Sequence, residues 1–215
     1  MMGMAVWSSL LAAGLCFAQV VSAVSTFPSV DHQNMTGEKA RAVGQSAAGE
    51  LLLIPRSRER IQQLGAPSCL GLATDYVITG DYAMVFRTPD GGGAIIQELH
   101  GLEIYTRSLQ PLKLESVNVP PFHGFLFFPR HTDCHALEFY AYGIRNGKAV
   151  PFSFQVGSSI LPYFETLPTE RPQVRDGQLV VVGGRGAGVD RSTVYYFAPD
   201  VENGLFRLTK TAQMK

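Results

Sequence analysis

The chain has 215 residues, and its 18 lysines and arginines balance 18 aspartates and glutamates. Because the net charge is zero, no overall field attracts nucleic acid or anionic lipid, and we expect no nucleic-acid partner. Only 17% of the residues are charged, while glycine (22 residues) and proline (13 residues) are abundant. This balance is typical of strands and turns rather than of helices.

Residues 1–23 have the pattern of an export signal. Leu10–Val21 is almost wholly apolar, and Val21-Ser22-Ala23 supplies the small residues that precede a cleavage site. Because the apolar run is short for a membrane span, we expect cleavage to leave a mature chain that begins near Val24 and keeps no stable membrane anchor. The predicted location is secreted or periplasmic.

The mature chain is expected to begin with a mobile leader, residues 24–49. This segment is rich in small polar residues and has no sustained apolar period. Residues 50–215 then have the length of a single domain. The first predicted strand of that domain is Glu50–Ile54, which Pro55 ends.

One short helix is predicted directly after this strand, at Ser57–Leu64. Ile61 and Leu64 would share one face of it, and Gly65 stands where a helix stop is expected.

From Tyr76 onward, short β-branched and aromatic runs alternate with turn residues. Asn-Gly and Asp-Gly pairs tolerate the positive φ angles of tight hairpins, and four such pairs occur, at Asp90-Gly91, Asn146-Gly147, Asp176-Gly177 and Asn203-Gly204. The predicted strands are Tyr76–Thr79, Tyr82–Arg87, Ala94–Glu98, Leu102–Thr106, Leu112–Asn118, Gly124–Phe128, Leu137–Tyr142, Val150–Gln155, Leu179–Val182, Thr193–Phe197 and Leu205–Leu208. The sequence therefore predicts an all-β, mainly antiparallel domain.

Two stretches of this region share one pattern of strand, loop, aromatic strand, Asn-Gly turn and strand. Phe139 and Asn146 in the first correspond to Tyr196 and Asn203 in the second, at a common offset of 57 residues. Repeated three-stranded units of this kind predict a small propeller-like or sandwich structure. The unit resembles the FG-GAP or VCBS type of extracellular propeller repeat, but it lacks that family's run of acidic calcium ligands, so no functional residue is transferred.

Signal cleavage leaves two cysteines, Cys69 and Cys134, and in an oxidising compartment we expect them to form a disulfide. The competing interpretation is two separately buried thiols. His131, Asp133 and His135 flank Cys134 and would share a face of an extended segment, as half of a metal site does. A structural loop is the favoured interpretation, so neither a metal nor a cofactor is predicted.

The predicted binding residues are Glu138, Tyr140 and Tyr142. Alternation along the strand Leu137–Tyr142 places these three on one face. If the other face packs in the core, this face displays two aromatic side chains beside an acid, as protein interfaces often do. The alternative is that both faces are covered and the tyrosine hydroxyls are bonded internally.

For function, the leading prediction is a non-enzymatic binding protein that recognises another protein, as an inhibitor or an immunity protein does. The alternatives are an exported hydrolase of glycan or peptide, and a carbohydrate-binding module. Acids or histidines that meet in one deep pocket would favour the enzyme, a flat aromatic strip would favour sugar, and an exposed loop or apolar patch would favour a protein partner.

Overall fold

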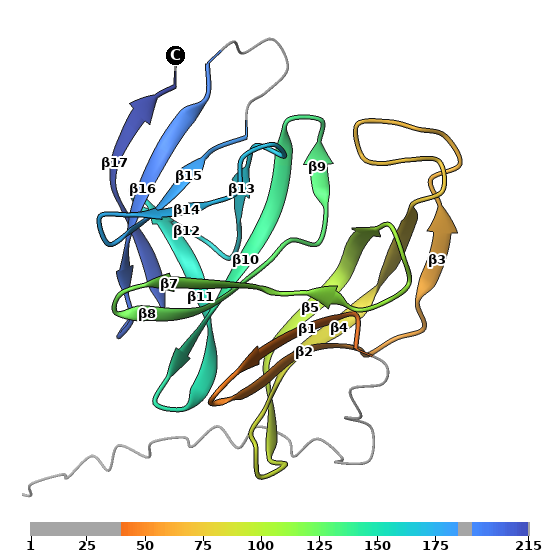
Figure 1. The fold of residues 1–215 in the computed structure, drawn as a ribbon, viewed down its shortest axis with the longest axis horizontal. Coiled ribbons are helices and arrows are strands. Elements are labelled where there is room, and N and C mark those ends of the chain that lie inside the picture. Colours follow the sequence, from red (N-terminus) through yellow and green to blue (C-terminus); the bar gives the residue numbers. More distant parts are fainter. Residues whose placement is uncertain (1–39, 185–190, 215) are drawn as a thin grey trace, which may run out of the picture.

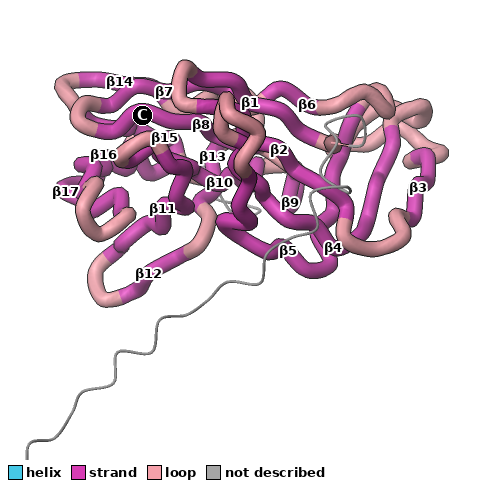
Figure 2. Tube along the Cα trace, turned by 90° about the horizontal axis from the view of Figure 1, so that it is seen from below, coloured by secondary structure: helices cyan, strands magenta, loops and turns pink. Residues whose placement is uncertain are grey.

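The computed structural model describes residues 40–184 and 191–214. Every regular element within these ranges is a strand, so the predicted all-β class is confirmed. Figure 2 shows strands joined by loops, with no helix in the described part. The predicted export signal, residues 1–23, and most of the predicted leader, residues 24–39, lie outside the described residues.

The first sheet has six strands. β4 is at its centre: it pairs with β5 along one side and with β3 and β2 along the other, always antiparallel. β1 follows β2, and β6 pairs with β1 in parallel. The strands are β1 (Ala42–Ser46), β2 (Gly49–Pro55), β3 (Arg60–Gln63), β4 (Tyr76–Arg87), β5 (Gly93–Thr106) and β6 (Leu112–Lys113).

The second sheet has eleven strands, eight of which form the path β14-β15-β16-β17-β11-β10-β8-β7. It curls until it is nearly closed, like a barrel, beside the first sheet (Figure 1). Arg171, just before β14, lies 3.5 Å from Glu115 of β7 and so joins the two ends of the path. The strands are β7 (Glu115–Val119), β8 (Phe122–Phe127), β9 (His131–Asp133), β10 (Ala136–Arg145), β11 (Lys148–Val156), β12 (Ser159–Leu161), β13 (Phe164–Thr166), β14 (Gln173–Arg175), β15 (Gln178–Val182), β16 (Thr193–Asp200) and β17 (Leu205–Gln213).

β8 and β10 form a layer that is shared by two hydrophobic cores. Tyr140 and Tyr142 of β10 pack with residues of the first sheet, whereas Phe139 points into the interior of the curled second sheet. Gly124 of β8 lies opposite Gly143 of β10. A Cβ atom on Gly124 would come within 2.0 Å of the Tyr142 carbonyl oxygen, so the two strands can pair this closely only with glycine there.

Nearly all the strands predicted from periodicity are present, and all four predicted pairs lie between strands, although at Asp90-Gly91 and Asn203-Gly204 only the glycine has a positive φ. Asn146-Gly147 joins β10 to β11 and Asp176-Gly177 joins β14 to β15, with φ between 51° and 71° at these four residues. The two similar stretches each form a three-stranded antiparallel meander, β8–β10–β11 and β15–β16–β17. The strands belong to two continuous sheets rather than to separate blades, and the repeat itself stays a prediction.

The predicted helix at Ser57–Leu64 is wrong, because Arg60–Gln63 forms strand β3. β3 is exposed along its whole length and pairs with the Tyr76–Thr79 half of β4, which extends beyond the end of β2. The local preference for a helix, which is weak over two turns, is overridden by the hydrogen bonds that β4 offers along its open edge.

The ordered domain also begins earlier than the predicted boundary at residue 50. Ala42–Ser46 forms β1, which pairs with β2 through a two-residue turn and buries Ala42 completely. The small side chains that suggested a mobile leader instead allow β1 to pack closely against its neighbours. A Cβ atom on Gly44 would lie only 3.0 Å from side-chain atoms of both Leu114 and Phe125.

Candidate functional site

The predicted binding residues Glu138, Tyr140 and Tyr142 are buried, with exposed fractions of 0%, 8% and 0%. They do lie on one face of β10, as the alternation indicated, but the first sheet covers that face. Tyr142 donates a hydrogen bond of 2.8 Å to Gln97 Oε1 on β5, and the Tyr140 ring packs 5.6 Å from that of Tyr163. The alternative interpretation, with both faces covered, describes the structure.

Glu138 belongs to an ion network at the edge of the layer between the sheets. Its Oε2 accepts hydrogen bonds from Arg130 Nε (3.2 Å) and Nη2 (3.1 Å), and Arg130 Nη1 reaches Glu103 of the first sheet at 3.2 Å. Burial, followed by the negative charge of Glu138, raises the pKa of Tyr140. Because Arg130 bonds both Glu138 of β10 and Glu103 of β5, the network ties the two sheets together.

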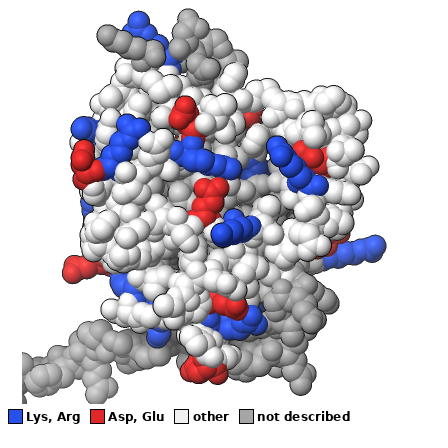
Figure 3. All heavy atoms as spheres, viewed as in Figure 1, with Lys and Arg blue, Asp and Glu red and all other residues white. Residues whose placement is uncertain are grey.

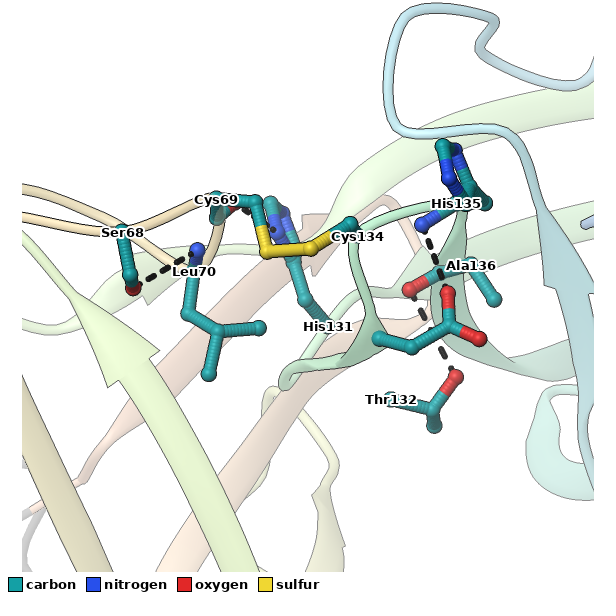
Figure 4. The surroundings of a disulfide bond; sticks show 9 residues. Ser68, Cys69, Leu70, His131, Thr132, Cys134, His135 and Ala136 are labelled. Carbon is teal, nitrogen blue, oxygen red and sulfur yellow. Dashed lines mark hydrogen bonds between the residues drawn. A yellow bond between two sulfur atoms is a disulfide. The ribbon is translucent and has the colours of Figure 1, made fainter. Parts of the chain in front are cut away.

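Cys69 and Cys134 form the predicted disulfide, with their Cα atoms 5.1 Å apart. Cys69 lies in the loop between β3 and β4 of the first sheet, and Cys134 lies in the turn between β9 and β10 of the second. The bond therefore joins the two sheets covalently. His131 Nδ1 lies 3.3 Å from the Cys69 carbonyl oxygen, on one side of this bond (Figure 4).

The three weak metal candidates do not converge. His131 lies beside Cys69, whereas His135 lies on the other side of Cys134 (Figure 4). Asp133 turns back to accept a hydrogen bond of 2.6 Å from the His135 backbone N–H. In residues 40–184 and 191–214, no three His, Cys, Asp or Glu side chains are grouped in a way that could hold a metal ion.

A groove of about 710 Å³ runs beside the disulfide, between the β3–β4 loop and the start of β10. Three arginines line it, but Arg130 is held by Glu103 and Glu138, and Arg171 lies over the Phe128 ring at 4.2 Å and close to Glu115. Arg107, the third arginine, is exposed to solvent. Asp75 and His131 also line the groove, but each has a partner in the neighbouring backbone: Asp75 Oδ2 accepts a hydrogen bond of 2.9 Å from the Leu72 backbone N–H, and His131 Nδ1 lies 3.3 Å from the Cys69 carbonyl oxygen.

The most exposed apolar segment of the second sheet is Ile160-Leu161-Pro162-Tyr163, which we term the β12 rim. Ile160 is 59% exposed, Leu161 38% and Tyr163 36%. The segment begins in β12, which leaves β11 after a two-residue turn and lies at the periphery of the molecule (Figure 2). Isolated exposed apolar residues are common, but four consecutive ones form a patch.

A hollow of about 400 Å³ adjoins the β12 rim, between that segment and the end of β15. Phe164 and Tyr195 line its wall with aromatic surface, and Glu165 is the acid in the lining, where it accepts a hydrogen bond of 2.8 Å from Thr132 Oγ1. Next to the rim, the hollow is large enough to take one apolar side chain of another molecule.

The β12 rim was missed by the sequence analysis. A proline inside an apolar run was the available signal, since proline cannot lie in the middle of a sheet and is confined to edges and bulges. Pro162 therefore marks Ile160 and Leu161 as residues at an edge rather than in the core.

The rest of the viewed surface carries no field of one sign. Figure 3 shows acidic and basic side chains largely beside one another, with wide uncharged areas between them. No described helix has the length and apolarity that crossing a membrane requires.

Comparisons of the chain with protein-family models, with curated proteins and with solved structures returned no match.

Proposed function

We propose that this chain is an exported, non-enzymatic binding protein that recognises another protein through the β12 rim, in the manner of an inhibitor or an immunity protein. The observation that carries the proposal is the run of exposed apolar side chains from Ile160 to Tyr163 beside the aromatic hollow. Much of the affinity of protein interfaces comes from a central apolar side chain of one protein that enters a pocket of the other. The β12 rim could supply such a side chain, and the adjacent hollow could accept one.

The expected partner contributes an extended segment with at least one large apolar side chain. β12 pairs with β11 on one side, and among the described strands none pairs with its other side. An open strand edge offers backbone N–H and C=O groups in a row, which an added strand can satisfy. Successive side chains of that strand point to opposite faces, so one would reach Ile160 and the next would reach the hollow beside Leu161.

Export is part of the proposal. The apolar signal pattern at residues 1–23 and the disulfide between Cys69 and Cys134 both fit an oxidising compartment. A disulfide that joins the two sheets also holds the scaffold rigid, which reduces the entropy that binding would otherwise lose.

We further propose that the meanders β8–β10–β11 and β15–β16–β17 are copies of one unit. Both have the same antiparallel connectivity, both turn at an Asn-Gly pair, and their third strands lie side by side in parallel. Two joined copies would explain how a short pattern produces one large curled sheet.

The test uses the mature protein as bait for affinity capture from the extract of its native source. We expect a stoichiometric protein partner whose recovery is lost with Ile160→Glu and is retained with the control Leu72→Glu, since Leu72 is equally exposed (60%) but lies in the β3–β4 loop. Equal recovery with both variants, or no partner at all, would refute the role of the rim. Turnover of a glycan or peptide library by the wild-type protein would instead support the exported hydrolase.

A further inference from the structure

β3 gives the first sheet an open edge. It pairs with β4 along one side, and among the described strands none pairs with its other side (Figure 1). All the residues of β3 are exposed, including the large apolar side chain of Ile61, which is 42% exposed. An edge of this kind presents backbone groups that another extended chain can satisfy.

The register of β3 shows which of its backbone groups face outward. The Leu64 backbone N–H donates to the Asp75 carbonyl oxygen at 2.9 Å, in continuation of the pairing between β3 and β4. In an antiparallel pair, opposite residues are hydrogen-bonded to each other at every second position. Gln62 is therefore bonded to β4, whereas the N–H and C=O groups of Ile61 and Gln63 point away from the sheet.

Two arginines with no acidic partner stand beside this edge. Glu59, directly before β3, turns inward: its Oε2 lies 2.7 Å from Arg41 Nη2, and its Oε1 accepts a hydrogen bond from Tyr82. Side chains alternate along an extended chain, and Arg58 and Arg60, on either side of Glu59, are both exposed. Neither guanidinium is paired with an acid in the part of the chain that the structure describes.

We propose that the segment Arg58–Gln63, which we term the β3 edge, binds an extended acidic segment of a partner protein, which adds to the first sheet as a further strand. The outward backbone groups of Ile61 and Gln63 would bond to the backbone of the added strand. Its carboxylates would pair with Arg58 and Arg60, since a guanidinium binds a carboxylate through two parallel N–H···O bonds.

This arrangement specifies the pattern of the partner segment. Successive side chains of a strand point to opposite faces, so acids that meet the arginines are expected at every second position. The residues between them would lie on the face of Ile61, and apolar side chains there would cover its exposed surface. The expected segment therefore alternates acidic and apolar residues, which distinguishes it in position and in chemistry from a partner of the β12 rim.

A second copy of the chain fits the β3 edge less well. Pairing of two β3 strands would place four arginines along one short pair of strands, and no described acid is free to offset them, because Glu59 is already bonded to Arg41 and Tyr82. Charges of one sign on an edge strand oppose such self-association. The same charges favour an acidic partner.

The first test measures the binding of a labelled short peptide of alternating glutamate and valine to the mature protein by fluorescence anisotropy. We expect Arg58→Glu combined with Arg60→Glu to raise the dissociation constant roughly tenfold or more. The matched control, Lys148→Glu combined with Arg191→Glu, makes the same change of charge at exposed positions in and beside the second sheet, and it should leave binding unaltered. Equal loss in both double variants, or no binding to the wild-type protein, would overturn the proposal.

A second measurement needs no substitution and locates the added strand. With the same peptide bound to the wild-type protein, amide exchange at Ile61 and Gln63 should slow, because their N–H groups gain acceptors. Exchange at Gln62, which is already bonded to β4, should change little. Protection confined to other strands would refute strand addition at the β3 edge. A heparin fragment that displaces the peptide without slowing exchange at Ile61 would assign the arginines to a sulfated glycan and would likewise refute it.

Discussion

The layer between the two sheets and the interior of the curled second sheet exclude water in different ways. Buried tyrosines with bonded hydroxyls occur in the layer: Tyr82 donates to Glu59 Oε1 and Tyr142 donates to Gln97 Oε1, both at 2.8 Å. The interior is built mainly of phenylalanine rings. Phe154 alone lies within 5.5 Å, centroid to centroid, of Phe139, Phe164, Phe197 and Phe206.

The two cores differ because the relative position of the two sheets has to be fixed by side chains, whereas the positions of strands within one sheet are fixed by the backbone. Two sheets that face each other can slide, and the hydrogen bond from Tyr142 of β10 to Gln97 of β5 fixes their relative position, because a shift would leave both groups unsatisfied. The bond from Tyr82 of β4 to Glu59, which directly precedes β3, lies within the first sheet's part of the chain and satisfies a buried hydroxyl there. The strands of the second sheet are already positioned by their backbone hydrogen bonds, so their interior needs only to be filled. Offset and edge-on rings do this at high density.

The largest effect is expected from Phe154→Ala. The ring is fully buried, so its removal leaves a cavity among four other rings and should lower the free energy of unfolding by about 3–5 kcal/mol. Denaturant unfolding measures this, with Val174→Ala, which is 42% exposed, as a control that should change little. A loss below about 1 kcal/mol would mean that the interior collapses around the gap.

Removal of the disulfide should have the next largest effect. Cys69 and Cys134 are 65 residues apart, and for a loop of that length the chain-entropy model predicts that the disulfide adds about 4 kcal/mol to the free energy of unfolding. Engineered changes usually show less than the model value, so we expect Cys69→Ser combined with Cys134→Ser to lower the free energy of unfolding by about 3 kcal/mol. Because the bond joins the two sheets, amide exchange should increase most where they meet, in β4 and β5. An increase confined to β16 and β17 would show that the bond acts elsewhere.

Tyr142→Phe tests the polar tie in the layer between the sheets. It removes one oxygen atom and leaves Gln97 Oε1 without its donor, so the unfolding free energy should fall by about 1 kcal/mol. Phe139→Leu, on the opposite face of the same strand, removes no polar group and serves as the comparison. If Tyr142→Phe is neutral in denaturant unfolding, water replaces the hydroxyl and the tie does not fix the sheets.

The smallest effect is a dependence on pH through Glu59. Burial raises its pKa, but the hydrogen bonds from Arg41 and Tyr82 together outweigh burial, so the pKa lies below its ordinary value of 4.5. The stabilisation is therefore complete above that value and is lost as the pH falls through the lowered pKa. Glu59→Gln should be less stable by up to about 1 kcal/mol at pH 7, and the difference from wild type should shrink as the pH falls through the lowered pKa. A difference that stays constant down to the acid limit of the folded protein would assign the loss to packing instead.

Much of the fold follows from local patterns in the sequence. Period-two runs located most strands, and Asn-Gly and Asp-Gly pairs located the turns, because both signals act over a few residues. The error at Arg60–Gln63 arose where a weak local preference competed with backbone pairing to β4, a strand more than ten residues away. Pairing over such distances leaves little trace in a single sequence.

The candidate site was harder to predict, for a related reason. Alternation placed Glu138, Tyr140 and Tyr142 on one face correctly, but it does not say which face meets water. The nearly unbroken apolar run from Ala136 to Gly143 was the available indication, since a strand that is covered on both sides loses its polar positions. The β12 rim depends on where a short edge strand leaves the sheet, and only the tertiary structure shows that.

The place of β17 in the second sheet has a consequence for the order of folding. β17 is the last described strand along the chain, yet it lies between β16 and β11, and β11 cannot gain this parallel neighbour until residues near 205 have been synthesised. The first sheet needs nothing beyond residue 113. A growing polypeptide can therefore assemble the first sheet early, whereas the aromatic second sheet stays open until residues near 205 have been synthesised, so the second sheet is vulnerable to proteases and to misassociation for longer.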